Sequence, residues 1–157
     1  MIRQQPGDLL EIQLDDAYFY VVVLSNIAMF GGNIVFAFHS DGTQRSLSEL
    51  LPTSSGFNVC TDLLYPKKKG TIRRLSRFQD TSPFWRTRLA KGTHEHRPGH
   101  KAKEWFIYRI EDLRHHFERT SNMSPEYKAA MAHSTFSFDL VAKKILAGYT
   151  PDQDPRL

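Results

Sequence analysis

The sequence predicts an α+β protein in which a curved antiparallel sheet, or a small partly open barrel, of about five strands carries C-terminal helices packed on it. Two patterns support this prediction. Apolar and polar residues alternate over residues 9–14, as in a half-buried strand, whereas residues 138–148 have the spacing of an amphipathic helix. The length of 157 residues predicts a single domain over residues 1–150, followed by a tail over residues 151–157.

The predicted strands are bounded by turn signals. Pro6-Gly7-Asp8 precedes the first strand, and the polar break Asp15-Asp16-Ala17 separates it from the second, so these two strands form an antiparallel hairpin. Further strands are rich in β-branched and aromatic residues. The predicted strands cover residues 9–14, 18–24, 34–38, 57–65 and 104–110.

Helices are predicted toward the C-terminal end of the chain. Ser124 as N-cap and Pro125 at the first helical position begin one helix. The last helix spans residues 138–148 and ends at Gly148. Residues 112–119 are expected to form a short helix, whereas residues 71–103 show only weak periodicity.

The composition is typical of a soluble globular protein, and the cysteine content is typical of a reducing compartment. The single cysteine, Cys60, excludes an intramolecular disulfide framework and a zinc ribbon. No apolar run approaches the roughly 20 residues that a membrane-spanning helix needs, and the first residues lack the apolar core of a signal peptide. We therefore expect a cytoplasmic protein without a membrane partner.

Charge is divided unevenly along the chain. Residues 1–64 hold two basic and seven acidic residues, a net charge of −5. Residues 65–157 hold 19 basic and 10 acidic residues, a net charge of +9. This division predicts either a charged partner or an attraction between the two halves of the chain.

Both halves offer candidate partner-binding residues. Arginine and tryptophan dominate the energetics of protein interfaces, and the basic half offers Arg73, Arg77, Trp85, Arg86 and Arg88. Cations that contact phosphates and rings that stack on bases are also typical of nucleic-acid binders, and this segment supplies Lys67–Lys69, Tyr65, Phe78 and Phe84. The acidic half offers an alternative face made of Asp15, Asp16, Asp41 and Glu49.

No motif predicts catalysis or a cofactor. His94, His96 and His100 have a spacing that zinc ligands adopt, but the basic residues around them oppose a dication, so no metal site is predicted. Cys60 lies in an apolar stretch and is expected to be a buried thiol. No serine lies in a nucleophile-elbow pattern. The chain is therefore predicted to act by binding and not as an enzyme.

The N-terminal pattern carries a family resemblance. Pro6-Gly7-Asp8 is followed by Leu10-x-Ile12-x-Leu14, Asp16, Tyr18, Tyr20 and Val22-x-Leu24, and a later strand contains Glu104-Trp105-Phe106-Ile107. Over residues 6–40 and 104–112, this pattern resembles the immunity protein 26 family of bacterial polymorphic and contact-dependent toxin systems.

The resemblance implies an immunity protein, an antitoxin of contact-dependent growth inhibition that acts in the cytoplasm. Such a protein binds one cognate toxin domain and covers its active site or an adjacent surface, without catalytic residues or cofactors. Complementary charge would speed association and select the partner. The basic face is the favoured docking face, because it holds the arginines and Trp85. The alternative function is a small basic nucleic-acid-binding module.

Overall fold

In the computed structural model the described residues are 4–27, 32–51, 55–63 and 70–157. The chain separates into two compact units. The first unit comprises residues 1–86 and 135–149, and the second comprises residues 87–134 and 150–157. No helix within the described ranges is long and apolar enough to cross a membrane.

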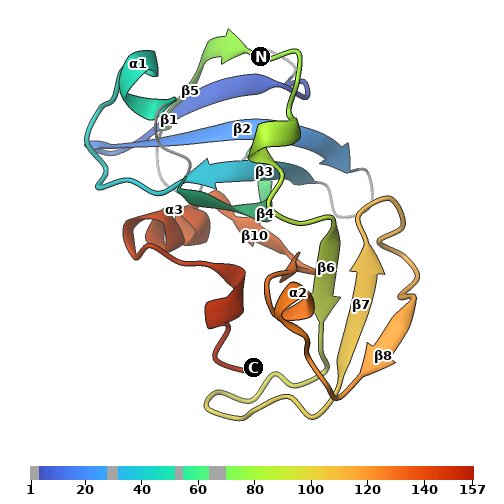
Figure 1. Cartoon of the computed structure of the whole chain (residues 1–157). Coiled ribbons are helices and arrows are strands. Elements are labelled where there is room, and N and C mark those ends of the chain that lie inside the picture. Colours follow the sequence, from blue (N-terminus) through green and yellow to red (C-terminus); the bar gives the residue numbers. More distant parts are fainter. Residues whose placement is uncertain (1–3, 28–31, 52–54, 64–69) are drawn as a thin grey trace. The chain divides into compact units, whose positions relative to one another are not determined.

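The first unit is built on a six-stranded sheet with the strand order β10-β4-β3-β2-β1-β5 (Figure 1). Neighbouring strands are antiparallel, except that β10 runs parallel to β4. The strands are β1 (Asp8–Leu14), β2 (Ala17–Ile27), β3 (Gly32–Phe38), β4 (Gly56–Asp62), β5 (Gly70–Arg77) and β10 (Thr135–Ser137).

Helix α3 (Phe138–Leu146) packs on one face of this sheet and forms the main core with it. The helix begins where predicted, because the Oγ of Ser137 accepts a hydrogen bond from the Leu140 N–H at 3.4 Å. Phe138 is buried, and its ring meets the ring of Phe19 edge-on at 6.2 Å. The inward residues of β1–β4 that complete this core are Leu10, Ile12, Leu14, Val21, Val23, Val35, Ala37, Phe57 and Val59.

Aromatic rings pack on the opposite face of the same sheet. Phe36 and Phe38 of β3 lie 4.9 Å apart, and Phe84 of the short helix η1 (Ser82–Phe84) contacts both rings. The buried Asn58 of β4 fixes this segment: its amide nitrogen donates to the Phe84 carbonyl, and its oxygen accepts from the Arg86 N–H. A one-turn helix, α1 (Leu47–Leu50), follows β3.

The second unit contains a four-stranded sheet with the strand order β8-β7-β6-β9. Ser124 caps a single-turn helix, its Oγ accepting a hydrogen bond from the Tyr127 N–H at 3.2 Å. Residues 112–119 do not form the predicted helix: residues 112–117 lead into β8, and residues 118 and 119 belong to that strand. The elements are β6 (Leu89–Gly92), β7 (Trp105–Arg109), β8 (Glu118–Thr120), α2 (Pro125–Lys128), β9 (Met131–Ala132) and η2 (Pro151–Gln153).

The α+β class is thus confirmed, with many strands and few helices. The prediction of one sheet of about five strands is wrong, because the strands divide into a six-stranded and a four-stranded sheet. The barrel alternative is also wrong. Both sheets are open, since their terminal strands have a single neighbour each in the described strand order.

A buried lysine ties the second unit together. Lys91 on β6 is 2% exposed, and its Nζ donates hydrogen bonds to the carbonyl oxygens of Lys128 and Pro151. Burial lowers the pKa of Lys91 to about 8, although the nearby Asp154 and Asp152 act in the opposite direction. The lysine therefore joins α2 and residues 151–157, predicted as a tail, to the sheet.

The core position of Phe138 predicts a large loss of stability on truncation. Phe138→Ala should lower the free energy of unfolding by about 3–5 kcal/mol, because it removes a buried ring from the α3–sheet contact. Leu140→Ala is the matched control on the same helix, since Leu140 is 40% exposed, and it should cost less than about 1 kcal/mol. Urea unfolding followed by tryptophan fluorescence measures both; equal losses would contradict this packing.

Lys91 predicts a pH dependence of stability. Its folded pKa of about 8 lies below the ordinary 10.5, so between these values the unfolded chain holds a proton that the folded chain has lost. Raising the pH through this window therefore favours the folded state. Relative to Lys91→Met, the wild type should gain about 1–3 kcal/mol in free energy of unfolding between pH 7.5 and about 10. Parallel pH profiles of the two proteins would contradict the prediction.

Candidate functional site

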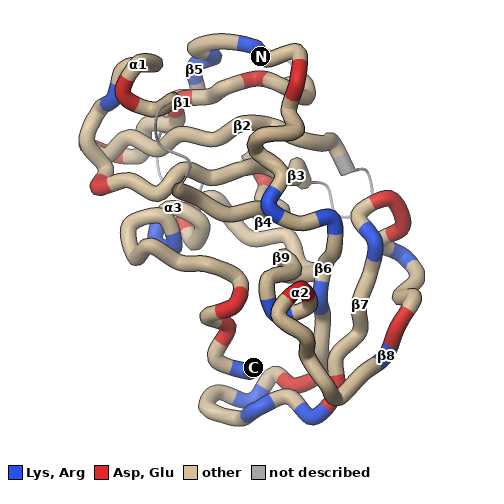
Figure 2. The backbone as a smooth tube through the Cα atoms, in the orientation of Figure 1, with Lys and Arg blue, Asp and Glu red and all other residues tan. Residues whose placement is uncertain are grey.

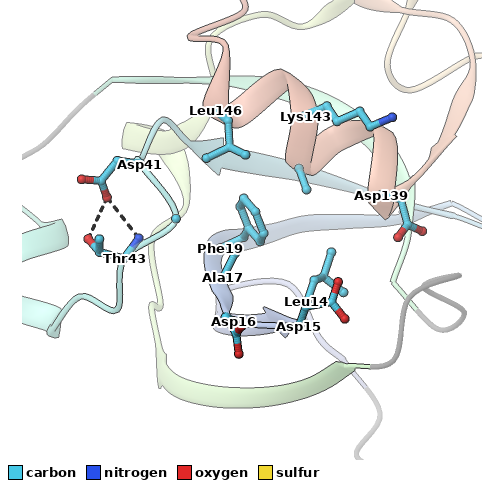
Figure 3. A pocket seen from close by; sticks show the side chains of 12 residues that line it. Leu14, Asp15, Asp16, Ala17, Phe19, Asp41, Thr43, Asp139, Lys143 and Leu146 are labelled. Atoms are coloured by element: carbon cyan, nitrogen blue, oxygen red, sulfur yellow. Dashed lines mark hydrogen bonds between the residues drawn. The ribbon is translucent and has the colours of Figure 1, made fainter.

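A pocket of about 450 Å³ lies in the first unit, between the β1–β2 turn, the loop after β3 and helix α3 (Figure 3). Four lining residues are acidic, namely Asp15, Asp16, Asp41 and Asp139, and Lys143 is basic, so the formal charge of the lining is −4 + 1 = −3. The apolar part of the wall consists of Leu14, Ala17, Phe19, Ala142 and Leu146. The pocket therefore combines negative charge with apolar surface.

The β1–β2 turn supplies two of the aspartates. Leu14 and Ala17 are the last paired residues of the hairpin, so Asp15 and Asp16 form its two-residue turn. Asp15 has a φ of 52°, in the left-handed region that aspartate and asparagine tolerate better than most residues. The polar break seen in the sequence is thus a tight turn whose two carboxylates line the pocket.

Asp41 is held in the loop after β3. Its Oδ1 accepts hydrogen bonds from the Thr43 hydroxyl at 2.7 Å, the Thr43 N–H at 3.1 Å and Arg45 Nη2 at 3.2 Å. The hydrogen bonds from Thr43, together with the Arg45 charge, lower the pKa of Asp41 to about 2. The Gly42 carbonyl accepts a hydrogen bond from the Tyr18 N–H at 2.9 Å, which fixes this loop against β2. Asp41 is therefore a positioned, ionised group.

Glu49, the fourth residue of the predicted acidic face, has a different role. It lies on α1 and is not among the pocket-lining residues. Its carboxylate caps the helix by accepting hydrogen bonds from the Ser46 N–H and hydroxyl, and it lies 3.7 Å from Arg45. Arg45 therefore connects Glu49 to Asp41, but Glu49 itself serves the short helix.

Helix α3 adds Asp139 and Lys143 to the pocket, and sequence reasoning missed this role. The two residues are four positions apart, so they lie on the same side of the helix. Their spacing marks only a polar helix face, and no local pattern relates them to the β1–β2 turn. The packing of α3 on the sheet brings them together with Asp15 and Asp16.

The basic residues favoured as the docking face are largely engaged within the first unit. Arg77 Nε lies 2.6 Å from the buried Asp8, and Arg73 Nη2 lies 2.9 Å from the buried Glu11. Burial alone would raise the pKa of Asp8, but hydrogen bonds from Arg77 and the Gln5 N–H, with the charges of Arg77 and Arg74, lower it. Figure 2 marks these basic positions on β5 and acidic positions on β1. The predicted attraction between the two halves of the chain therefore operates inside the sheet.

The remaining residues of that set are not gathered beside these two arginines by any described contact. Trp85 and Arg86 follow η1, where the Arg86 guanidinium lies 4.6 Å from the centre of the Phe36 ring and donates to the Pro83 carbonyl. Arg88 belongs to the second unit. Phe78 and Phe84, predicted to stack on bases, pack against each other with ring centres 5.0 Å apart. Tyr65 and Lys67–Lys69 lie outside the described residues.

The histidines and the cysteine have structural surroundings. In the described part of the chain no three His, Cys, Asp or Glu side chains form a group that could hold a metal ion. His94 packs its ring on Phe106. Cys60 is buried beside Thr135, and burial raises the pKa of its thiol. His39 donates from Nε2 to the Tyr149 carbonyl at 2.6 Å, which leaves Nδ1 to accept from the Ser55 hydroxyl.

Comparison with known proteins finds no matching family model, no matching curated protein and no matching solved structure. The resemblance to the immunity protein 26 family is therefore a sequence-level expectation. The structure shows one candidate site for such a function, the pocket that Asp15, Asp16, Asp41 and Asp139 line.

Proposed function

We propose that this chain is an immunity protein that binds and neutralises a cognate bacterial toxin domain, and that the aspartate-lined pocket takes a basic side chain of that toxin. The partner class comes from the sequence resemblance. The docking site comes from the convergence of four aspartates from three chain segments on one pocket. No catalytic role is assigned to any of these residues.

The pocket suits a lysine or arginine side chain. The carboxylates would accept hydrogen bonds from the ammonium or guanidinium group, and such charge-assisted hydrogen bonds are stronger than neutral ones. The aliphatic stem of the same side chain would lie along Leu14, Phe19 and Leu146. Both parts of a basic side chain thus have a complementary surface.

The acidic docking face is preferred over the basic one for a physical reason. Arg73 and Arg77 already neutralise the buried Glu11 and Asp8. A toxin that recruited these arginines would leave a buried carboxylate without its cation, which costs several kcal/mol. The pocket aspartates are not among the buried charged residues, so contact with a toxin would not leave a buried carboxylate without its cation. Asp15 and Asp16 are exposed at the hairpin turn.

Inhibition would follow from the kind of toxin that such a pocket selects. A nuclease domain carries lysines and arginines that contact phosphates. A ring of carboxylates can occupy those cations in place of phosphates and thereby block substrate binding. Opposite charges on the two proteins would also accelerate association at low ionic strength.

The first experiment is co-expression of the chain with the C-terminal domain encoded by the neighbouring upstream gene. A stable complex in a pulldown, together with restored growth, is the expected result. Failure to bind and failure to protect would contradict the immunity proposal.

The pocket is tested on that complex with Asp15→Asn/Asp16→Asn. Asparagine keeps the left-handed turn and removes only the charge, so folding should be retained while the Kd rises about 10- to 100-fold, mainly through slower association. Glu111→Gln/Glu126→Gln is the matched control, because it removes the same charge from exposed positions of the second unit. Wild-type affinity of the pocket variant, with binding lost in Trp85→Ala/Arg86→Ala, would assign the interface to the basic residues instead.

A further inference from the structure

A cluster of five aromatic rings lies on one face of the second unit's sheet. Along β7, Trp105 and Ile107 are buried, whereas Phe106 and Tyr108 are half-buried, so the latter two point to the opposite, more open face. Three histidines from other segments join them. The cluster, here called the ring cluster, consists of His94, Phe106, Tyr108, His116 and His133.

The rings are in continuous contact. His94 and His116 each lie 4.9 Å from Phe106, centre to centre, and His116 also reaches Tyr108 at 6.0 Å. Tyr108 and His133 are stacked, with centres 3.7 Å apart and planes only 7° apart. His94 and His116 are exposed, and the other three rings are half-buried. The cluster is therefore a broad aromatic surface and not part of a closed core.

The backbone holds this surface in place. Gly92 of β6 is paired with Phe106, and a Cβ at Gly92 would lie 3.5 Å from the His133 Cβ and 3.7 Å from a ring carbon of Tyr108. These are ordinary van der Waals distances, so the stacked pair lies directly against the strand at Gly92. His133 Nε2 donates to the Leu113 carbonyl at 2.6 Å, which fixes the orientation of its ring. The stacked pair is therefore preorganised.

Positive charge accompanies the rings. Arg119 of β8 is paired with Phe106, and its guanidinium lies 6.0 Å from the Phe106 ring centre. Two acidic groups near the cluster in sequence are paired with arginines, Glu104 with Arg119 and Glu95 with Arg97, and Glu118 accepts a hydrogen bond from the Tyr127 hydroxyl. Arg119 is thus the cation that the described contacts place beside the ring cluster.

We infer that the ring cluster is a binding site for single-stranded nucleic acid. Flat bases stack on aromatic rings, and phosphates bind cations, so this polymer matches both features of the surface. Phe106, Tyr108 and the exposed His116 provide the stacking surface, and Arg119 provides a phosphate contact. Recognition of this kind tolerates many base sequences, because every base has a π face. The inference is independent of the toxin-binding proposal.

The site differs from the one that composition suggested. Phe78 and Phe84 of the basic segment pack on each other, whereas the ring cluster belongs to β7 and its neighbours. Aromatic rings and arginine also occur at protein interfaces, whereas binding of an oligonucleotide that weakens steeply with salt is the property expected of a nucleic-acid site. A titration with single-stranded oligonucleotides therefore tests the inference.

The probe is a fluorescein-labelled oligouridine, with an oligothymidine of the same length, titrated with the full-length protein and followed by fluorescence anisotropy. Binding should weaken steeply with salt. Tyr108→Ala and Phe106→Ala should each weaken it about 5- to 100-fold, since stacking contributes roughly 1–3 kcal/mol per base. Tyr18→Ala, which removes a half-buried tyrosine from the first unit, is the matched control and should leave binding unchanged.

Two further variants separate binding from folding. Tyr108→Phe keeps the ring and should retain wild-type affinity, so its loss with an intact thermal melt would overturn the stacking role. Arg119→Gln should lower the slope of log K against log salt by about one, as expected for one phosphate contact. No binding of either oligonucleotide to the wild type at low salt, or equal binding by Tyr108→Ala, would overturn the inference.

Discussion

The first unit depends on how two buried carboxylates of β1 are neutralised. Asp8 and Glu11 lie on one strand, and ionised groups are costly to bury without partners. Their cations come from β5, since Arg77 reaches Asp8 and Arg73, 62 residues beyond its partner, reaches Glu11. The backbone register is consistent with this pairing, because Glu11 is opposite Arg73 and Asp8 is opposite Arg77. Charge and register together thus make β5 the edge strand next to β1.

The same carboxylates are connected to the wall of the pocket. The Tyr20 hydroxyl donates to Glu11 and accepts from the Arg45 N–H, while the Arg45 guanidinium donates to Asp41. Burial, with the neighbouring Glu11 carboxylate, raises the pKa of Tyr20 to about 12, so the phenol keeps its proton as a donor. A chain of hydrogen bonds therefore runs from the β1–β5 pair to the loop that carries Asp41. The loop is therefore hydrogen-bonded to the sheet through Tyr20 and Arg45.

Local patterns predicted the elements that local forces determine. The hairpin around Asp15-Asp16 and the helix after Ser137 follow from alternation, turn residues and a cap, and all are present. The strand β5 was missed because an edge strand with alternating polar residues has no apolar signature; its partner β1 lies far away in the sequence. The sequence predicts an acidic face and not a pocket, and three of the four residues of that face line the pocket. Asp15, Asp16 and Asp41 were proposed from charge, whereas Asp139 joined them only through the packing of α3.

The net charge of the chain does not describe the charge of its individual surfaces. The total is +4, yet the pocket lining carries −3, from four aspartates and one lysine. A cluster of carboxylates repels phosphates, so a nucleic acid would avoid the pocket and bind beside Arg119. A basic toxin side chain would in turn avoid Arg119 and enter the pocket. Like-charge repulsion discriminates against the wrong partner as effectively as attraction selects the right one. The two proposed sites are thus mutually exclusive in ligand chemistry, and each can be tested without interference from the other.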